Sequence, residues 1–127
     1  GQIAYVMGRE KVSITWKSSK SVDYDKPIVI LTDEQTEGVS EVFAAALQER
    51  GRAQVLGKKT MGRAVMTSFF EVPSTGNVVK LVTGKYCTAG GAEIDKNGVI
   101  PDVEYSDAGT EEQMTILTKA AELLGMQ

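Results

Sequence analysis

The stretch IVILTDEQTEGVSEVFAAALQERGRAQVL, residues 28–56, decides the fold. It opens with Ile28–Thr32, a continuous apolar run rich in β-branched side chains, which is typical of a strand buried on both faces. We therefore expect this strand at the centre of a parallel sheet. A second short strand is expected at Gln54–Leu56.

A helix of about residues 39–50 separates these two strands. Its apolar side chains recur at spacings of three and four, which predicts one buried face, whereas Glu41 falls elsewhere on the helix. The predicted face consists of Val39, Val42, Phe43, Ala46 and Leu47. Gly51 lies where a glycine commonly follows a helix. Residues 28–56 thus predict a β-α-β unit with a right-handed crossover.

The rest of the chain predicts shorter strands and one more helix. The expected strands are Ile3–Met7, Val12–Trp16, Ala64–Val72, Val78–Val82 and Lys85–Thr88. The third and fourth of these are expected to form an antiparallel pair. A C-terminal helix of about residues 111–124 follows, with Thr110 as its N-cap and Gln113 completing a capping box. Its apolar stripe would be Met114, Leu117, Ala121 and Leu124. The fold class is therefore α/β.

Composition indicates an ordinary globular domain. The chain has 127 residues, of which 42% are hydrophobic and 24% charged, and its net charge is −3. This charge gives no reason to expect a nucleic acid or an anionic membrane as partner. No apolar run is long enough for a membrane span.

The lone cysteine and the absence of histidine restrict the possible chemistry. Cys87 has no second cysteine to pair with, and a zinc site that needs several Cys or His ligands is excluded. A catalytic pair or triad that uses histidine is excluded unless another chain supplies that residue. We expect Cys87 to be a small buried strand residue, and we expect neither a metal nor a cofactor.

Residues Gly38–Arg63, GVSEVFAAALQERGRAQVLGKKTMGR, resemble the catalytic segment of the S41 peptidases, also called C-terminal processing or tail-specific proteases. In that family the segment reads roughly SASEI-x-A-x-A-L-x-x-x-GRA-x-x-x-G-x-x-T-F-GK. The residues that carry the likeness are Ser40, Glu41, Val42, Gly51, Arg52, Ala53, Gly57, Thr60 and Gly62. The resemblance implies a ClpP/crotonase-like core, in which the nucleophile sits at a strand-to-helix turn.

The resemblance also implies that both catalytic side chains are replaced. The family's serine nucleophile falls on Gly38 and its lysine base on Arg63. Glycine offers no nucleophile, and a guanidinium stays protonated in proteins, so it cannot act as the base. Glu49 falls where the family often has a third, orienting polar residue, although a solvated charge is the simpler interpretation.

Two neighbouring hydroxyls are the fallback nucleophiles. Ser40 lies on the opposite side of the first helical turn from Gly38, so we expect it to bond free backbone N–H groups. Thr36 lies in the loop before Gly38, with Lys58 and Lys59 as the bases that remain open. By resemblance, Gly38, Val39 and Gly62 are the candidate substrate-binding residues.

The likeness continues to about residue 105. It includes Gly98–Val103, GVIPDV, in which Asp102 is expected to bond nearby backbone N–H groups. Residues 1–127 are thus expected to form a single S41 peptidase-like domain without a PDZ domain, part of a longer protein. The leading hypothesis is a catalytically inactive domain that binds a polypeptide or protein.

Two alternatives stay open. The first is an active serine-type endopeptidase that uses a relocated nucleophile or residues outside this chain. The second is an assembly module whose C-terminal helix packs on a partner, or which self-associates to cover exposed strand edges. The family resemblance implies an extracytoplasmic location, in the bacterial envelope or secreted.

Overall fold

The computed structural model describes residues 1–21, 24–105 and 110–125, with the backbone alone for residues 110–114. These residues form two sheets and two helices. The larger sheet is antiparallel, in the order β2-β1-β6-β5, and the smaller is parallel, in the order β3-β4-β7. Their strands are β1 (Gln2–Met7), β2 (Val12–Lys17), β3 (Val29–Thr32), β4 (Gln54–Gly57), β5 (Val65–Val72), β6 (Asn77–Thr88) and β7 (Val103–Glu104).

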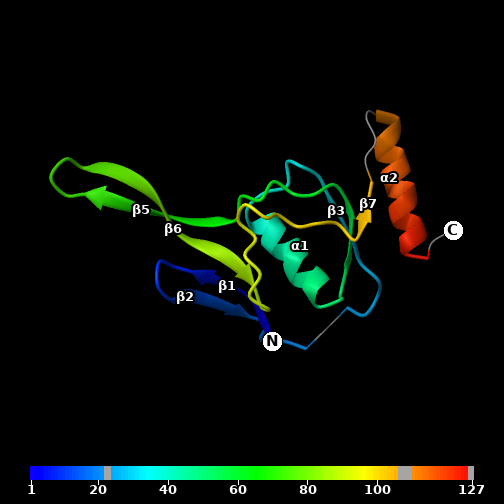
Figure 1. The fold of residues 1–127 in the computed structure, drawn as a ribbon, viewed down its shortest axis with the longest axis horizontal. Helices are drawn as coiled ribbons and strands as arrows, with labels where there is room; N and C mark the ends of the chain where they lie inside the picture. Colours follow the sequence, from blue (N-terminus) through cyan, green and yellow to red (C-terminus); the bar gives the residue numbers. More distant parts are fainter. Residues whose placement is uncertain (22–23, 106–109, 126–127) are drawn as a thin grey trace.

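Helix α1 (Val39–Glu49) lies between the two sheets, and helix α2 (Thr110–Leu123) lies beyond the parallel sheet (Figure 1). The far end of the β5–β6 hairpin extends away from this body. The predicted α/β class, the β-α-β unit of β3, α1 and β4, and the antiparallel β5–β6 pair are confirmed.

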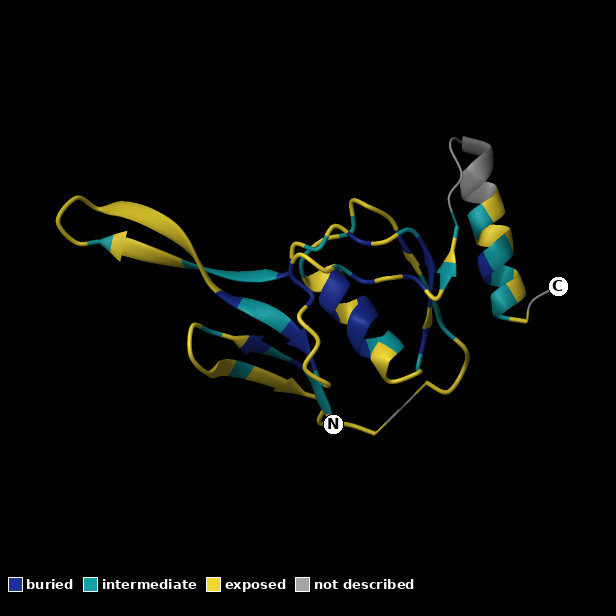
Figure 2. Ribbon diagram, viewed as in Figure 1, coloured by how far each residue is buried: buried dark blue, intermediate teal, exposed yellow. Residues whose placement is uncertain are grey.

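The core surrounds α1, as the buried residues in Figure 2 show. Three consecutive small residues, Ala44, Ala45 and Ala46, are buried on this helix and allow both sheets to approach it closely. The core cluster consists of Ala4, Val42, Ala44, Ala45, Val55, Ala64, Ile94 and Val99. Cys87 is buried in β6, which confirms the prediction of a small buried strand residue.

The buried face of α1 matches the predicted one only in part, through Val42 and Ala46. Val39 and Phe43 are 69% and 59% exposed, whereas Glu41 is fully buried. The prediction failed because it assumed that the charged Glu41 side chain faces solvent. The helix is instead rotated so that this carboxylate enters a set of hydrogen bonds inside the protein.

Strand β3 is not the central strand. It is an end strand of the parallel sheet, where β4 takes the middle, and Leu31 is 41% exposed. The prediction of a central strand was therefore wrong, because no described strand covers its outer edge, and the exposure of Leu31 shows that one face is partly open to solvent. The predicted strands 78–82 and 85–88 are one continuous strand, β6.

The parallel sheet depends on a close backbone approach at Gly57. A Cβ atom added to this residue would lie 2.1 Å from the carbonyl oxygen of Thr32 on the neighbouring strand. Gly57 also has a φ of +131°, which L side chains rarely adopt. The glycine that the family resemblance matched is thus needed where β3 and β4 end side by side.

The exposed side of α2 also differs from the prediction. Leu117 is 54% exposed, and among the side chains of this helix that the structure describes, Ala120 is the buried one. The expected N-cap Thr110, its partner Gln113 and the stripe residue Met114 lie outside the described side chains. None of the described helices is long and apolar enough to cross a membrane.

Candidate functional site

Gly38 occupies the turn between the loop after β3 and the first residue of α1. It has φ +67° and ψ −130°, a conformation that favours glycine, and a Cβ atom there would meet nothing within 4 Å. Its N–H donates to the carbonyl oxygen of Arg63 over 3.0 Å. The structure therefore places side by side the two positions at which the family resemblance puts the nucleophile and the base.

The carboxylate of Glu41 holds this arrangement together from inside the protein. Its two oxygens accept four hydrogen bonds, from the N–H groups of Gly38, Gly62 and Arg63 and from the hydroxyl of Thr60. The four distances run from 2.5 to 3.1 Å. All four groups are donors, so both oxygens of the buried carboxylate have hydrogen-bond partners, which offsets the cost of removing them from water.

The hydroxyl of Thr60 extends these bonds to the GVIPD segment. It donates to Glu41 and accepts from the N–H of Val99 over 2.7 Å, and Thr60 is itself buried. At the other end of that segment, the carboxylate of Asp102 accepts from the N–H of Val55 over 2.7 Å. Asp102 thus bonds a backbone N–H, as predicted.

The side chain of Arg63 faces a neighbouring acid on the surface. Its guanidinium forms an ion pair with Glu37 over 3.2 Å, and both side chains are exposed. A guanidinium in an ion pair with a carboxylate remains a cation, so Arg63 can hold an anion but cannot take a proton from a hydroxyl. The space near Gly38 therefore contains an exposed arginine–glutamate ion pair.

The fallback hydroxyls differ in their surroundings. Ser40 is exposed, and no hydrogen bond of its side chain occurs within the described part of the chain, so the expected bond to backbone N–H groups is absent. Glu41, one residue later, bonds the Gly38 N–H instead. Thr36 donates its hydroxyl proton to Asp33 over 3.1 Å and accepts from the Asp33 N–H.

Neither open lysine bonds the Thr36 hydroxyl. Lys58 forms an ion pair with Glu34 over 3.2 Å. The pKa of Glu34 is lowered by a hydrogen bond from its own backbone N–H and then by the bond from Lys58. No described acceptor or carboxylate partner is recorded for Lys59.

Glu49 lies at the opposite end of α1 from Gly38. Eleven helical residues separate the ends of this helix, a length of roughly 16 Å at about 1.5 Å per residue. Its carboxylate accepts from the hydroxyl of Thr88 over 2.7 Å and from the N–H of Gly90 over 3.1 Å. Glu49 thus anchors the end of β6 to the helix and does not join Gly38 and Arg63.

Other catalytic or metal-binding groups are scarce in the described residues. Burial raises the pKa of the Cys87 thiol, which disfavours the nucleophilic thiolate. The described residues contain no group of three or more His, Cys, Asp or Glu side chains that could hold a metal ion.

The candidate substrate-binding residues lie at the same turn. Gly38 and Gly62 both use their N–H groups on the Glu41 carboxylate. Val39 begins α1 and is largely exposed. As the first helical residue it has no carbonyl partner within the helix, so its N–H remains the candidate donor for a ligand.

Sequence reasoning missed Glu41 and Thr60 as the centre of the site. The signal was present, since a glutamate at the third helical position after a cap commonly bonds back to the cap N–H. The bonds from Thr60, Gly62 and Arg63 join positions at least nineteen residues away in the chain. Local spacing carries no information about such contacts.

Comparison with known proteins extends the likeness over most of the chain. A model of peptidase family S41 matches residues 1–105. The carboxyl-terminal-processing protease of Picosynechococcus sp. is 34% identical over 100 residues, which are 79% of this chain and 24% of that protein. The carboxy-terminal processing protease CtpA of Bacillus subtilis is 33% identical over 103 residues, 81% of this chain and 21% of that protein.

Solved structures share the fold. The photosystem II D1 C-terminal processing protease superposes with a TM-score of 0.77 at 28% identity, over 84% of this chain and 28% of that chain. A lipoprotein from Streptococcus agalactiae superposes with a TM-score of 0.69 at 17% identity, over 97% and 45%, which is a likeness of fold alone. The chain spans about a quarter of the length of the curated relatives it matches.

The Glu41→Gln variant tests the bonds that form the site. The substitution replaces one acceptor oxygen with an NH2 group, which would face other donors. The free energy of unfolding should therefore fall by about 2–4 kcal/mol. The measurement is urea-induced unfolding of both proteins. Glu71→Gln is the matched control, expected to change stability by less than about 1 kcal/mol because Glu71 is exposed on β5 and its carboxylate has no hydrogen bond or ion pair within the described residues. Equal effects of the two substitutions would contradict the assigned role of Glu41.

Proposed function

This chain belongs to peptidase family S41, and we propose that it is a non-catalytic member of the family that binds polypeptides. The observation that carries the proposal is the pairing of Gly38 with Arg63. At the turn where the family resemblance puts the nucleophile there is no hydroxyl, and the adjoining residue in the base position is a permanent cation.

The surroundings of Gly38 support the loss of catalysis. Glu37 lies next to this turn and forms an ion pair with Arg63. A carboxylate at this place disfavours the negative charge that develops on the carbonyl oxygen during acyl transfer. The replaced pair therefore lacks the nucleophile, and the ion pair with Glu37 offsets the Arg63 cation, which could otherwise stabilise that charge.

One observation favours the alternative of a peptidase with a relocated nucleophile. The carboxylate of Asp33 accepts the hydroxyl proton of Thr36 and is the only described acceptor for it. Both groups are exposed or half-buried, however, and the same carboxylate accepts from the N–H of Gln35. This pattern is that of a loop turn, in which the hydroxyl serves the backbone.

The outer edge of β3 supports polypeptide binding. The carbonyl groups of Ile28 and Thr32 accept hydrogen bonds from the N–H groups of Gln54, in β4, and Lys58, directly after it. Because backbone groups alternate along a strand, those of Val29 and Leu31 point to the opposite edge, which no described strand covers. An extended polypeptide can add to such an edge through main-chain hydrogen bonds.

A hollow beside this edge offers space for side chains of the added segment. It has a volume of about 360 Å³ and lies between β3 and the first turns of α1. Its lining includes Leu31, Thr36, Val39 and Phe43, so it begins at the same loop and turn as the replaced catalytic positions. A polypeptide laid along β3 would therefore pass Gly38.

The proposal extends to location and assembly. An extracytoplasmic location rests on family membership, as the relatives named above are bacterial processing proteases and others are chloroplastic. We also propose that copies of the chain associate with one another through exposed strand edges.

Hydrolysis of casein, an unstructured protein, tests the loss of catalysis. The unmodified chain should cleave no more casein than a protein-free blank, because neither Gly38 nor Arg63 can perform its step. The Gly38→Ser/Arg63→Lys double variant is the comparison, and cleavage by it alone would trace the inactivity to these two side chains. Cleavage by the unmodified chain that Thr36→Ala or Ser40→Ala abolishes would overturn the proposal.

The Leu31→Pro variant tests the polypeptide-binding edge. Proline removes the N–H that faces outward and is tolerated on edge strands, so labelled casein should bind about tenfold more weakly or worse. Leu31→Ala is the matched control, expected to lose less than about threefold because its N–H remains. Unchanged melting temperatures would show that both variants fold, and equal binding by the two would contradict strand addition at β3.

A further inference from the structure

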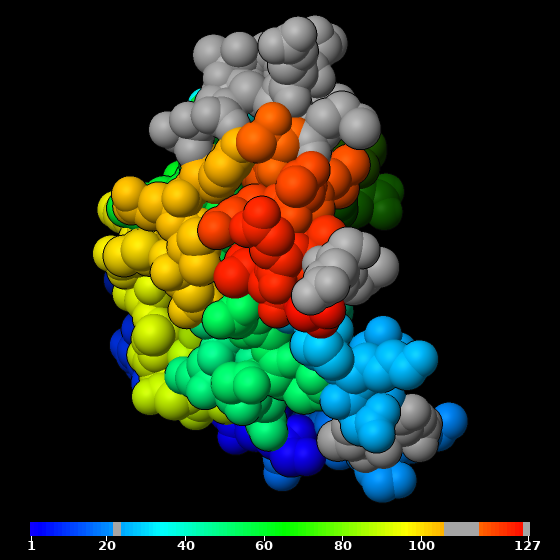
Figure 3. Space-filling model, turned by 90° about the vertical axis from the view of Figure 1, so that its right-hand side faces the viewer, coloured from blue at the N-terminus to red at the C-terminus, as the bar shows by residue number. Residues whose placement is uncertain are grey.

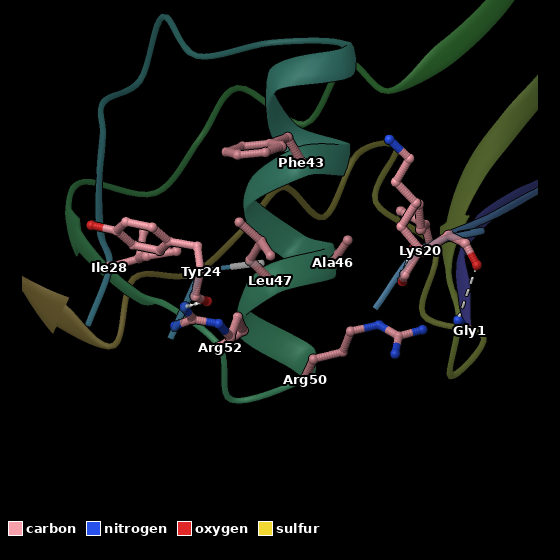
Figure 4. A pocket seen from close by; sticks show the side chains of 11 residues that line it. Gly1, Lys20, Tyr24, Ile28, Phe43, Ala46, Leu47, Arg50 and Arg52 are labelled. Atoms are coloured by element: carbon pink, nitrogen blue, oxygen red, sulfur yellow. Dashed lines mark hydrogen bonds between the residues drawn. The ribbon is translucent and has the colours of Figure 1, made fainter. Parts of the chain in front are cut away.

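A second hollow, away from the Gly38 turn, lies against the later half of α1 (Figure 4). Its volume is about 620 Å³, within the usual range for small-molecule sites. Its apolar wall is formed by Phe43, Ala46 and Leu47 of the helix, with Ile3 and Ile28 from the flanking segments. Aliphatic side chains predominate, so this wall suits a flexible hydrocarbon better than a polar ring.

The rim of this hollow is positively charged. Lys20, Arg50 and Arg52 line it, and none of them forms an ion pair with a described carboxylate. In Figure 4, Lys20 and Arg50 lie to one side of the helix, Tyr24 and Arg52 to the other, and the apolar helix residues lie between them. Three cations around one cavity, none with an ion pair among the described residues, stand out in a chain whose net charge is −3.

The three cations differ in how free they are to meet a ligand. Arg52 donates to the carbonyl oxygens of Tyr24 and Lys26 and lies over the Tyr24 ring, so it is fixed in the wall. Lys20 and Arg50 are exposed, and no side-chain hydrogen bond is recorded for either within the described residues. These two side chains can therefore turn toward a bound anion, while Arg52 adds a positive field.

We propose that this hollow binds an amphipathic carboxylate, an aliphatic chain that ends in one carboxylate group, as in a free fatty acid. The tail would displace water from Phe43 and Leu47, and the carboxylate would meet Lys20 and Arg50 at the rim. A ligand with polar groups along its length is disfavoured, because the apolar wall would leave those groups without partners. This proposal does not rest on polypeptide binding at β3. The Phe43 ring, however, lines both hollows.

The test compares two ligands with the same tail and opposite charge. Decanoate and decyltrimethylammonium are titrated into the whole chain below their micelle-forming concentrations, and the backbone amide signals of Ala46 and Leu47 are followed by NMR. Decanoate should shift these signals with an affinity at least about tenfold higher than that of the cation. Raising the salt concentration should weaken decanoate alone, because the rim is exposed.

Variants then assign the contacts. Lys20→Gln/Arg50→Gln should weaken decanoate about tenfold and leave the cation unchanged or slightly tighter. Lys119→Gln, on α2, is the matched control that keeps the decanoate affinity. Phe43→Ser should weaken the binding of both ligands, because it removes part of the apolar wall. The variant should still fold, because the ring is exposed. Lys20→Gln alone, in an exposed loop, gives the same readout if the double variant does not fold.

Three results would overturn the proposal. One is the absence of shifts at Ala46 and Leu47 up to the solubility limit of decanoate. Another is equal affinity for decanoate and decyltrimethylammonium, which would mean that the tail alone is recognised. The last is decanoate binding that neither salt nor the substitutions at Lys20 and Arg50 alter.

Discussion

The buried carboxylate of Glu41 is the constraint on which the rest of the site depends. It joins the first turn of α1 to residues 60–63 and, through the hydroxyl of Thr60, to the segment that begins at Val99. A carboxylate without water is costly unless donors surround it, so each of these segments has to stay in place. The parallel sheet, the Gly38 turn and the GVIPD segment are thereby held in one geometry.

This constraint explains how the fold accommodates Gly38 and Arg63 at the positions where the family resemblance puts the nucleophile and the base. Gly38 and Arg63 contribute to the bonds around Glu41 only through their backbone N–H groups. Replacement of either side chain leaves those donors in place. The residues that the fold needs, Glu41, Thr60 and Gly62, are those in which the chain agrees with the family segment. Structure and chemistry are therefore carried by different atoms of the same turn.

The sequence predicted the β-α-β unit and the β5–β6 pair because each follows from local periodicity and turns. It failed where a distant contact overrides periodicity. The apolar spacing of α1 predicted that Phe43 would be buried, but the bonds to Glu41 turn that ring outward, where it lines both hollows. Likewise, the apolar run of β3 predicted two buried faces, although position in a sheet depends on which strands pair, which spacing cannot reveal.

Exposed apolar surface occurs on α1 and also on elements that lie away from it. On the β5–β6 hairpin, which Figure 2 shows as largely exposed, it includes Phe69, Phe70, Val78, Val79, Leu81 and Val82. Figure 3 shows α2 lying across the outside of the body, beside the segment that leads into β7. Extensive exposed apolar surface is characteristic of sites that contact other molecules, and it agrees with a role in binding.

A double-mutant cycle between Glu41 and Thr60 tests the central claim most directly. The free energies of unfolding of Glu41→Gln, Thr60→Val and the double variant would be compared with that of the unmodified chain. If the carboxylate and the hydroxyl act as one unit, the double variant should lose less than the sum of the single losses by about 1–3 kcal/mol. Losses that add, with a coupling energy near zero, would contradict the role assigned to the buried carboxylate.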